Sequence, residues 1–163
     1  MSGQPLPKYR AKIEPAWIDY NGHLRDACYG LIVSYAIDEV MNDLGLDAAY
    51  RARTSCTLYT LEMHLHYLHE VKSTDEVDVL TSVLDADQKR IHLGCRFTCP
   101  RLPDALATAD TMLLHVHQGD TPRSAVFPDL IAERLRLLAL PSDEAAAWGP
   151  ASRKIEIRRR AAT

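Results

Sequence analysis

A single apolar stripe constrains the fold of this chain more than any other feature of its sequence. Between residues 27 and 44, apolar side chains recur every three or four positions, at Tyr29, Ile32, Ala36, Val40 and Leu44. This period predicts one amphipathic helix over residues 27–44. Asp26 is a candidate cap for the start of the helix, and Gly45 for its end. Because one side of the helix is apolar, that side must be buried against a second layer of structure.

The segments after this helix have the composition and alternation of strands. Four stretches fit that pattern, at residues 58–68, 77–84, 91–99 and 106–117. Residues 9–13 form a weaker first strand, and Pro128 opens a short C-terminal helix that reaches Leu138. The order predicts an α+β domain in which an antiparallel five-stranded sheet wraps around one long central helix.

The strand predicted at residues 58–68 has two chemically different faces. Leu61, Met63 and Leu65 alternate with polar residues and are expected to face the helix. The opposite face then carries four polar side chains, those of Thr60, Glu62, His64 and His66. Such a face suits solvent, a ligand or another subunit better than a hydrophobic core.

Length and composition exclude several classes of protein. A chain of 163 residues with 47% hydrophobic and 25% charged residues predicts one globular domain. The net charge of −3 argues against binding nucleic acid through bulk positive charge. We expect no membrane segment, because the apolar runs are too short. Four cysteines without a CxxC pair predict reduced thiols, and hence a cytoplasmic protein.

The segment WIDYNGHL, residues 17–24, precedes the predicted helix and concentrates polar groups. Asn21 and Gly22 predict a turn, but they do not explain Asp19 or His23. A helix start presents free backbone N–H groups that can polarise a carbonyl oxygen. A carboxylate beside it can attack an acyl group directly or deprotonate a water molecule that does so, and His23 could orient that water. The alternative is that Asp19 only caps the turn.

Two stretches of the sequence resemble a known family. Asp19, Asn21 and His23 match an Asp-x-Asn-x-His pattern within EPAWIDYNGHLRDACY, and LYTLEMHLHYLHEV follows the helix. Over residues 9–118 the chain is similar to the hot-dog-fold acyl-CoA thioesterases of the 4-hydroxybenzoyl-CoA thioesterase-like group. It looks most like the thioesterases of carnitine degradation, which hydrolyse betainyl-CoA to glycine betaine.

The resemblance implies a fold, a reaction and an assembly. It implies a hot-dog core over about residues 9–118 with a C-terminal extension over 119–163. The activity would be hydrolysis of a small acyl-CoA thioester without a cofactor or a metal. The assembly would be a homodimer, or a homotetramer, with the strand at residues 58–68 at the subunit contact.

The resemblance also assigns roles to residues. Asp19 would be the catalytic carboxylate, with His23 and Asn21 beside it, and the backbone N–H groups of Asp26 and Ala27 would bind the carbonyl oxygen. One departure bears on that last role. Many relatives read His-Val-Asn-Asn where this chain reads His-Leu-Arg-Asp, so an acidic side chain at Asp26 can compete with substrate for those N–H groups.

Substrate contacts are predicted from aromatic and charged residues. Candidates for an aromatic box around a quaternary ammonium group are Trp17, Tyr20, Tyr29, Tyr59 and Tyr67. Glu62 and His66 would approach the active site of the partner subunit. Lys89 and Arg90, or Lys72, would bind the CoA phosphates.

Three alternatives use other residues or no chemistry at all. Glu62, His64 and His66 on one strand face are a workable zinc set, with His115 and His117 as a second histidine pair. Cys28 in the first helical turn is a candidate nucleophile with His23. The third alternative is a hot-dog subunit that binds acyl groups without catalysis.

Overall fold

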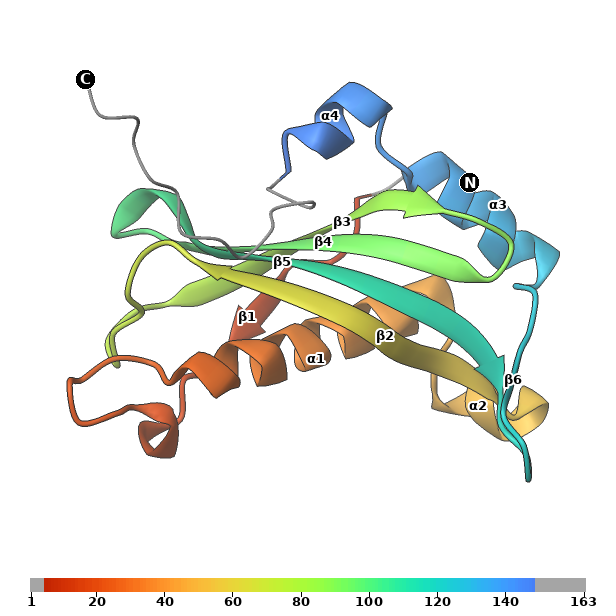
Figure 1. Ribbon diagram of the computed structural model, residues 1–163, viewed down its shortest axis with the longest axis horizontal. Helices are drawn as coiled ribbons and strands as arrows, with labels where there is room; N and C mark the ends of the chain where they lie inside the picture. Colours follow the sequence, from red (N-terminus) through yellow and green to blue (C-terminus); the bar gives the residue numbers. More distant parts are fainter. Residues whose placement is uncertain (1–4, 149–163) are drawn as a thin grey trace, which may run out of the picture.

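The computed structural model describes residues 5–148 and has the predicted architecture (Figure 1). Helix α1 (Asp26–Leu44) lies along the concave side of a curled antiparallel sheet. The main strands are β1 (Tyr9–Ala11), β2 (Cys56–Tyr67), β3 (Val77–Ala86), β4 (Arg90–Cys99) and β5 (Leu102–His117). Their order is β1-β3-β4-β5-β2, and the two-residue β6 (Arg123–Ser124) pairs with β5. The predicted α+β hot-dog fold is confirmed, with one short strand more than expected.

Burial of α1 follows the apolar stripe. All five stripe residues are less than 5% exposed, and they form part of the core between helix and sheet. The helix ends as predicted at Gly45, whose φ of 82° is a left-handed conformation that glycine adopts without strain. The predicted cap at the other end is wrong. Arg25 is the N-cap residue and makes no side-chain cap, while Asp26 is the first helical residue.

A β-bulge in β2 changes the predicted faces of that strand. The pairing with β5 shifts between Thr60 and Glu62, so Leu61 is an extra residue that remains 56% exposed. After the bulge, Met63 and Leu65 do lie against the core, and both approach Gly30 of α1. Before it, the alternation is reversed. Thr60, predicted on the polar face, stands opposite the buried Leu113.

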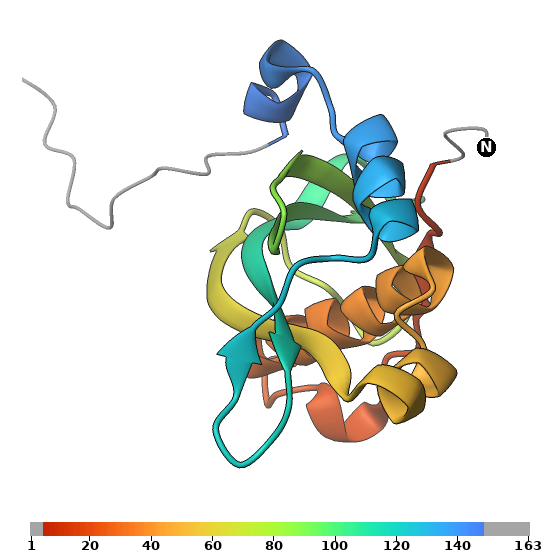
Figure 2. The same ribbon diagram turned by 90° about the vertical axis from the view of Figure 1, so that its right-hand side faces the viewer.

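Three further helices and a 3-10 turn lie outside the predicted long helix. They are η1 (Pro15–Trp17), α2 (Ala48–Thr54), α3 (Asp129–Leu138) and α4 (Ser142–Ala146). α3 agrees with the predicted C-terminal helix, whereas α2 was not predicted; its start is capped by Asp47, which accepts the Tyr50 N–H at 2.8 Å. Figure 2 shows α3 beside the sheet, and its residues Ile131 and Leu135 belong to the core. The described part of the C-terminal extension therefore contributes to the hydrophobic core.

The two edges of the sheet differ in how they are covered. β1 pairs with Val77–Val79 of β3, and further along that edge the Leu140 N–H donates to the Val83 carbonyl. β2 forms the other edge, with no strand beyond it within residues 5–148. β5 begins at Leu102, four residues before the strand predicted at residues 106–117. Of the helices in the described part of the chain, none has the length and apolar character needed to span a membrane.

Candidate active site

The turn before α1 is closed by the side chain of Asp19. Its Oδ1 accepts the backbone N–H groups of Asn21 at 2.8 Å and His23 at 3.0 Å. Gly22 has a φ of 80° and donates its N–H to the Asp19 carbonyl at 3.0 Å. The His23 N–H, followed by the Asn21 N–H, lowers the pKa of Asp19 below the ordinary 3.8. Asp19 is therefore an ionised, oriented carboxylate at neutral pH.

Backbone hydrogen bonds attach this turn to two other segments. The Leu24 N–H donates to the Val71 carbonyl at 2.8 Å, and the Arg25 N–H donates to the Trp17 carbonyl at 2.9 Å. Leu24 itself is 5% exposed, so its side chain anchors the turn in the core. The turn consequently has a fixed position beside the connection between β2 and β3.

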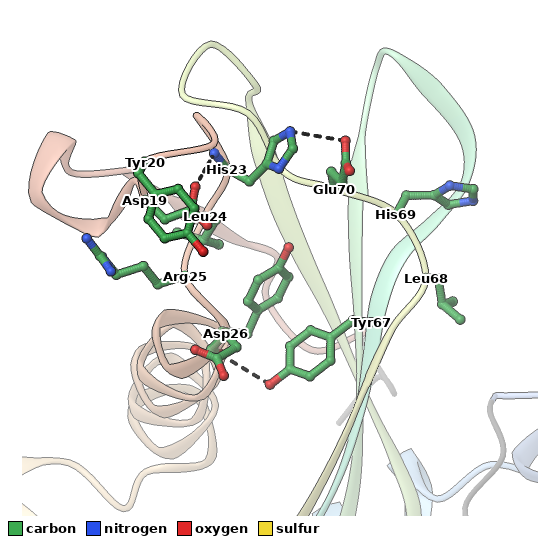
Figure 3. Close-up of a pocket in the computed structure, with 11 residues that line it drawn as sticks. Asp19, Tyr20, His23, Leu24, Arg25, Asp26, Tyr67, Leu68, His69 and Glu70 are labelled. Atoms are coloured by element: carbon green, nitrogen blue, oxygen red, sulfur yellow. Dashed lines mark hydrogen bonds and ion pairs between the residues drawn. The ribbon is translucent and has the colours of Figure 1, made fainter. Parts of the chain in front are cut away.

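That connection contributes an acidic side chain to the site. Glu70 Oε2 lies 3.1 Å from His23 Nε2 (Figure 3). The connection is held in turn by Arg101, which donates to the Glu70 carbonyl at 2.9 Å and pairs with Asp75 at 2.8 Å. The Arg101 guanidinium lowers the pKa of Asp75, whose side chain is 5% exposed. Glu70 is thus held beside His23 by a connection that the Arg101 contacts fix in place.

The first turn of α1 is partly occupied by its own residues. Asp26 Oδ1 accepts the Ala27 N–H at 2.8 Å, and the Arg25 carbonyl accepts the Cys28 N–H at 3.0 Å. Within residues 5–148, the Asp26 N–H has no hydrogen-bond partner. Of the two predicted carbonyl-binding donors, the Asp26 N–H is therefore unpaired in the described part of the chain, whereas the Ala27 N–H already binds the competing carboxylate.

A cavity of about 450 Å³ joins the turn, the helix start and the end of β2. Figure 3 shows Asp19 and His23 on one side of it, Asp26 at the helix start, and Tyr67 and Glu70 across from them. Tyr29 also lines the cavity, and its ring meets the Tyr67 ring at 83° with centroids 5.0 Å apart. A fixed carboxylate, a histidine and an aromatic wall around one cavity can bind and hydrolyse a small acyl ester.

Several predicted site residues lie away from this cavity in the single chain. The face of β2 that is turned away from the core carries Glu62, His64 and His66. Tyr59 lies on the same face, before the bulge. Lys89 lies in the β3–β4 turn and Arg90 is the first residue of β4. Arg90 pairs with Asp87, and the pKa of Asp87 falls to about 2. Trp17 and Cys28 are half-buried against the core and do not line the cavity. Their roles in substrate binding or catalysis stay predictions.

The alternative zinc set is not assembled. Glu62 and His64 form a pair at 2.7 Å. Across the part of the chain that the structure describes, no group of three or more His, Cys, Asp or Glu side chains could hold a metal ion. The two histidines of the second pair have different environments. His115 is buried and hydrogen-bonded, whereas His117 is exposed.

Five residues that line the cavity were not predicted from the sequence: Leu24, Arg25, Leu68, His69 and Glu70. Three of them follow Tyr67 directly, at the end of β2. The sequence did carry a sign of these three residues. The stretch LYTLEMHLHYLHEV, which resembles the family, includes them and runs through Glu70. What the sequence did not show is that the end of this strand returns to the start of α1.

Comparisons with known proteins agree on one family. A family model described as the thioesterase-like superfamily matches residues 13–135. A Pseudomonas aeruginosa protein named betainyl-CoA thioesterase is 46% identical over 83% of this chain and 85% of its own length. A Rhizobium meliloti protein named L-carnitine dehydrogenase/betainyl-CoA thioesterase is 31% identical over 83% of this chain, which corresponds to 27% of that longer protein.

Solved structures give the same result. A putative thioesterase from Pseudomonas putida shares 36% identity with this chain at a TM-score of 0.77, covering 98% of this chain and 99% of that one. A Staphylococcus aureus protein solved in complex with CoA shares 28% identity at a TM-score of 0.82, covering 97% and 98%. In both comparisons the similarity covers nearly all of this chain and nearly all of the other chain.

Proposed function

The chain belongs to the thioesterase-like superfamily, and from this membership we propose that it hydrolyses a small acyl-CoA thioester, with betainyl-CoA as the first substrate to test. The observation that carries the proposal is the position of Asp19, an ionised and rigidly held carboxylate in a cavity at the start of α1. The 46% identity to a protein named betainyl-CoA thioesterase supports the choice of acyl group.

Hydrolysis requires that oxygen from water replaces sulfur on the acyl carbon. In one route Asp19 takes a proton from water while the water oxygen bonds to the carbonyl carbon. In the other, Asp19 attacks that carbon itself and water then cleaves the anhydride. In both, the C–S bond breaks and the CoA thiolate leaves and is protonated. The proposed donor to the carbonyl oxygen is the Asp26 N–H, which has no hydrogen-bond partner within residues 5–148. A single turnover in ¹⁸O-labelled water detects direct attack, because the label enters Asp19 only when water opens the anhydride at the Asp19 carboxyl carbon.

We also propose that the enzyme is a homodimer formed through β2. This edge strand is twelve residues long, and an unpaired edge of that length is a template for association. Antiparallel pairing of two copies places the start of one β2 beside the end of the other. The partner subunit's Tyr59 would then approach this chain's cavity. A homotetramer, formed when two dimers stack, is the further assembly that a mass measurement distinguishes.

The same two-fold pairing would bring the predicted CoA-binding residues, Lys89 and Arg90, close to the active-site cavity of the partner subunit. Arg90 pairs with Leu114 near the end of β5, whereas Tyr67 beside the cavity pairs with Ala107 near its start. Within one chain the two positions are therefore at opposite ends of the sheet. Two-fold pairing brings the partner subunit's Lys89 and the partner subunit's Arg90 toward this chain's cavity.

All four cysteines are free thiols, which supports our further proposal of a cytoplasmic location.

The test is release of free CoA thiol from a panel of esters. We expect hydrolysis of betainyl-CoA and weaker hydrolysis of branched and aromatic acyl-CoA esters, at rates that a chelator does not change. Failure to release thiol from any ester would overturn the enzyme proposal. Activity that a chelator removes and zinc restores would move the chemistry to Glu62, His64 and His66.

A further inference from the structure

We propose that Tyr67, together with Tyr29 and Asp26, makes this cavity selective for an acyl group that carries a positive charge. This inference rests on the proposed thioesterase function and names the residues that choose its substrate. All three residues line the cavity that contains Asp19.

The two tyrosine rings form two walls of a corner. They meet at 83° with their centroids 5.0 Å apart. Tyr29 is 4% exposed and fixed in the core, whereas Tyr67 is 53% exposed and presents ring surface to the cavity. Adjacent aromatic walls at a right angle are the arrangement that binds quaternary ammonium groups, because the negative faces of the rings attract the cation.

The charge of the cavity wall has the sign that such a group requires. The residues lining the cavity include three carboxylates, those of Asp19, Asp26 and Glu70, and one guanidinium, that of Arg25. Asp26 is close enough to Tyr67 that its carboxylate raises the pKa of that phenol, after the larger effect of burial. The Tyr67 hydroxyl donates to the Asp26 backbone carbonyl at 3.3 Å, which fixes the ring against the helix start (Figure 3).

The Asp26 carboxylate should raise the energy of the transition state when the acyl group is neutral. A positive charge on the acyl group should offset this effect. Its carboxylate binds the Ala27 N–H and adds negative charge at the helix start, where the oxyanion of the transition state would form. A positive charge on the acyl group compensates both effects. In a betainyl ester a single methylene separates the ammonium nitrogen from the carbonyl carbon. The cation must therefore lie beside the reacting carbon, in the same cavity as Asp19, and this is where Tyr67 and Asp26 are found.

The experiment compares two esters of the same shape and different charge. The probes are betainyl-CoA and 3,3-dimethylbutyryl-CoA, in which carbon replaces the ammonium nitrogen. The measured quantity is the ratio of their kcat/KM values. For the wild type we expect a ratio of at least about ten in favour of betainyl-CoA, in line with a desolvated cation–π contact.

Variants then assign the preference to residues. Tyr67→Leu should lower the ratio about tenfold, and Tyr67→Phe should keep it within about threefold of the wild type, because the ring face remains. Asp26→Asn should lower the ratio about fivefold, since the group is exposed and its charge is screened. The matched control is Tyr35→Leu, an exposed tyrosine of α1 outside the cavity, which should keep the wild-type ratio.

The outcomes separate this inference from the proposed function. If the wild type hydrolyses both esters at the same rate, or if Tyr67→Leu keeps the wild-type ratio, the cation subsite is wrong while the thioesterase proposal stands. If neither ester is hydrolysed, the proposed function itself fails. Should Tyr67→Leu not fold, as judged by circular dichroism, the Asp26→Asn ratio decides, and a wild-type ratio there overturns the subsite.

Discussion

His23 Nε2 lies 3.1 Å from Glu70 Oε2, and this contact joins the turn that holds Asp19 to the connection after β2. The Glu70 side chain is 66% exposed, so the pair contributes little to stability. Its effect should instead be on the orientation of the imidazole. Glu70→Ala is expected to lower kcat about fivefold while the thermal unfolding midpoint stays unchanged, because a general acid–base group contributes only when it is positioned.

The control for this change is Glu76→Ala, which removes an equally exposed carboxylate that pairs with Arg10. Steady-state kinetics and thermal unfolding of both variants check the prediction. A Glu70→Ala enzyme with the wild-type kcat would show that the contact does not orient His23. An equal loss in Glu76→Ala would show that the loss reflects a general change in surface charge.

Removal of the imidazole should cost less than removal of the carboxylate. For His23→Ala we expect kcat to fall about tenfold, because the unpaired Asp26 N–H, the proposed donor to the carbonyl oxygen, would be retained. Thiol release under saturating substrate measures this loss beside that of Asp19→Asn. Complete loss in His23→Ala beside a mild effect of Asp19→Asn would exchange the two roles.

Stability should depend on pH through the buried His115. Its Nδ1 donates to the Ala125 carbonyl at 3.0 Å, so Nε2 accepts the Tyr50 hydroxyl at 2.9 Å and the ring is neutral. Burial lowers the pKa of His115 below 6.5, so the unfolded chain takes up a proton first as the pH falls. The contribution of His115 to stability is therefore present above pH 6.5 and is lost as the pH falls toward the lowered pKa.

His115→Gln tests this dependence, because glutamine is polar but does not titrate. We expect it to lower the free energy of unfolding by about 1–3 kcal/mol at pH 7.5. The difference from the wild type should shrink between pH 7 and pH 5. Urea unfolding at several pH values measures it, and a difference that stays constant with pH would refute the assignment.

The β2 edge should control assembly. Leu61 is 56% exposed at the bulge, and a charge on an exposed edge strand opposes pairing with a second copy. Leu61→Lys is expected to give monomers by light scattering at concentrations where the wild type is a dimer. Leu130→Lys, at a 75% exposed position on α3, is the control that should leave the mass unchanged. A wild-type protein that is monomeric and fully active would refute assembly through β2.

Periodic features of the fold could be predicted from the sequence. The stripe on α1 and the strands 77–86 and 90–99 have local patterns that burial then reinforces. The bulge at Leu61 could not be predicted in this way, since one inserted residue reverses the alternation without a glycine or proline to mark it. Asp26 was misassigned as a cap because an acidic residue suits both the N-cap and the first turn.

The candidate site was predictable where its residues are close in sequence. Asp19, Asn21 and His23 belong to one turn whose chemistry can be read locally. Glu70 and Tyr67 could not be placed from periodicity, because they meet that turn only when β2 ends beside the start of α1. Long-range pairs of this kind depend on topology, which in this chain only the resemblance supplied.

The most direct test of Asp19 as the catalytic carboxylate is the rate of thiol release from betainyl-CoA by the purified Asp19→Asn protein. Asparagine has the same shape and should preserve the turn, so thermal unfolding should match that of the wild type. We expect kcat to fall at least about a hundredfold, the effect of removing a positioned acid–base or nucleophilic group. Because the pKa of Asp19 lies below 3.8, the wild-type rate should show no acid limb from this residue above pH 5. A folded Asp19→Asn protein that turns over at the wild-type rate would show that Asp19 is not the catalytic carboxylate.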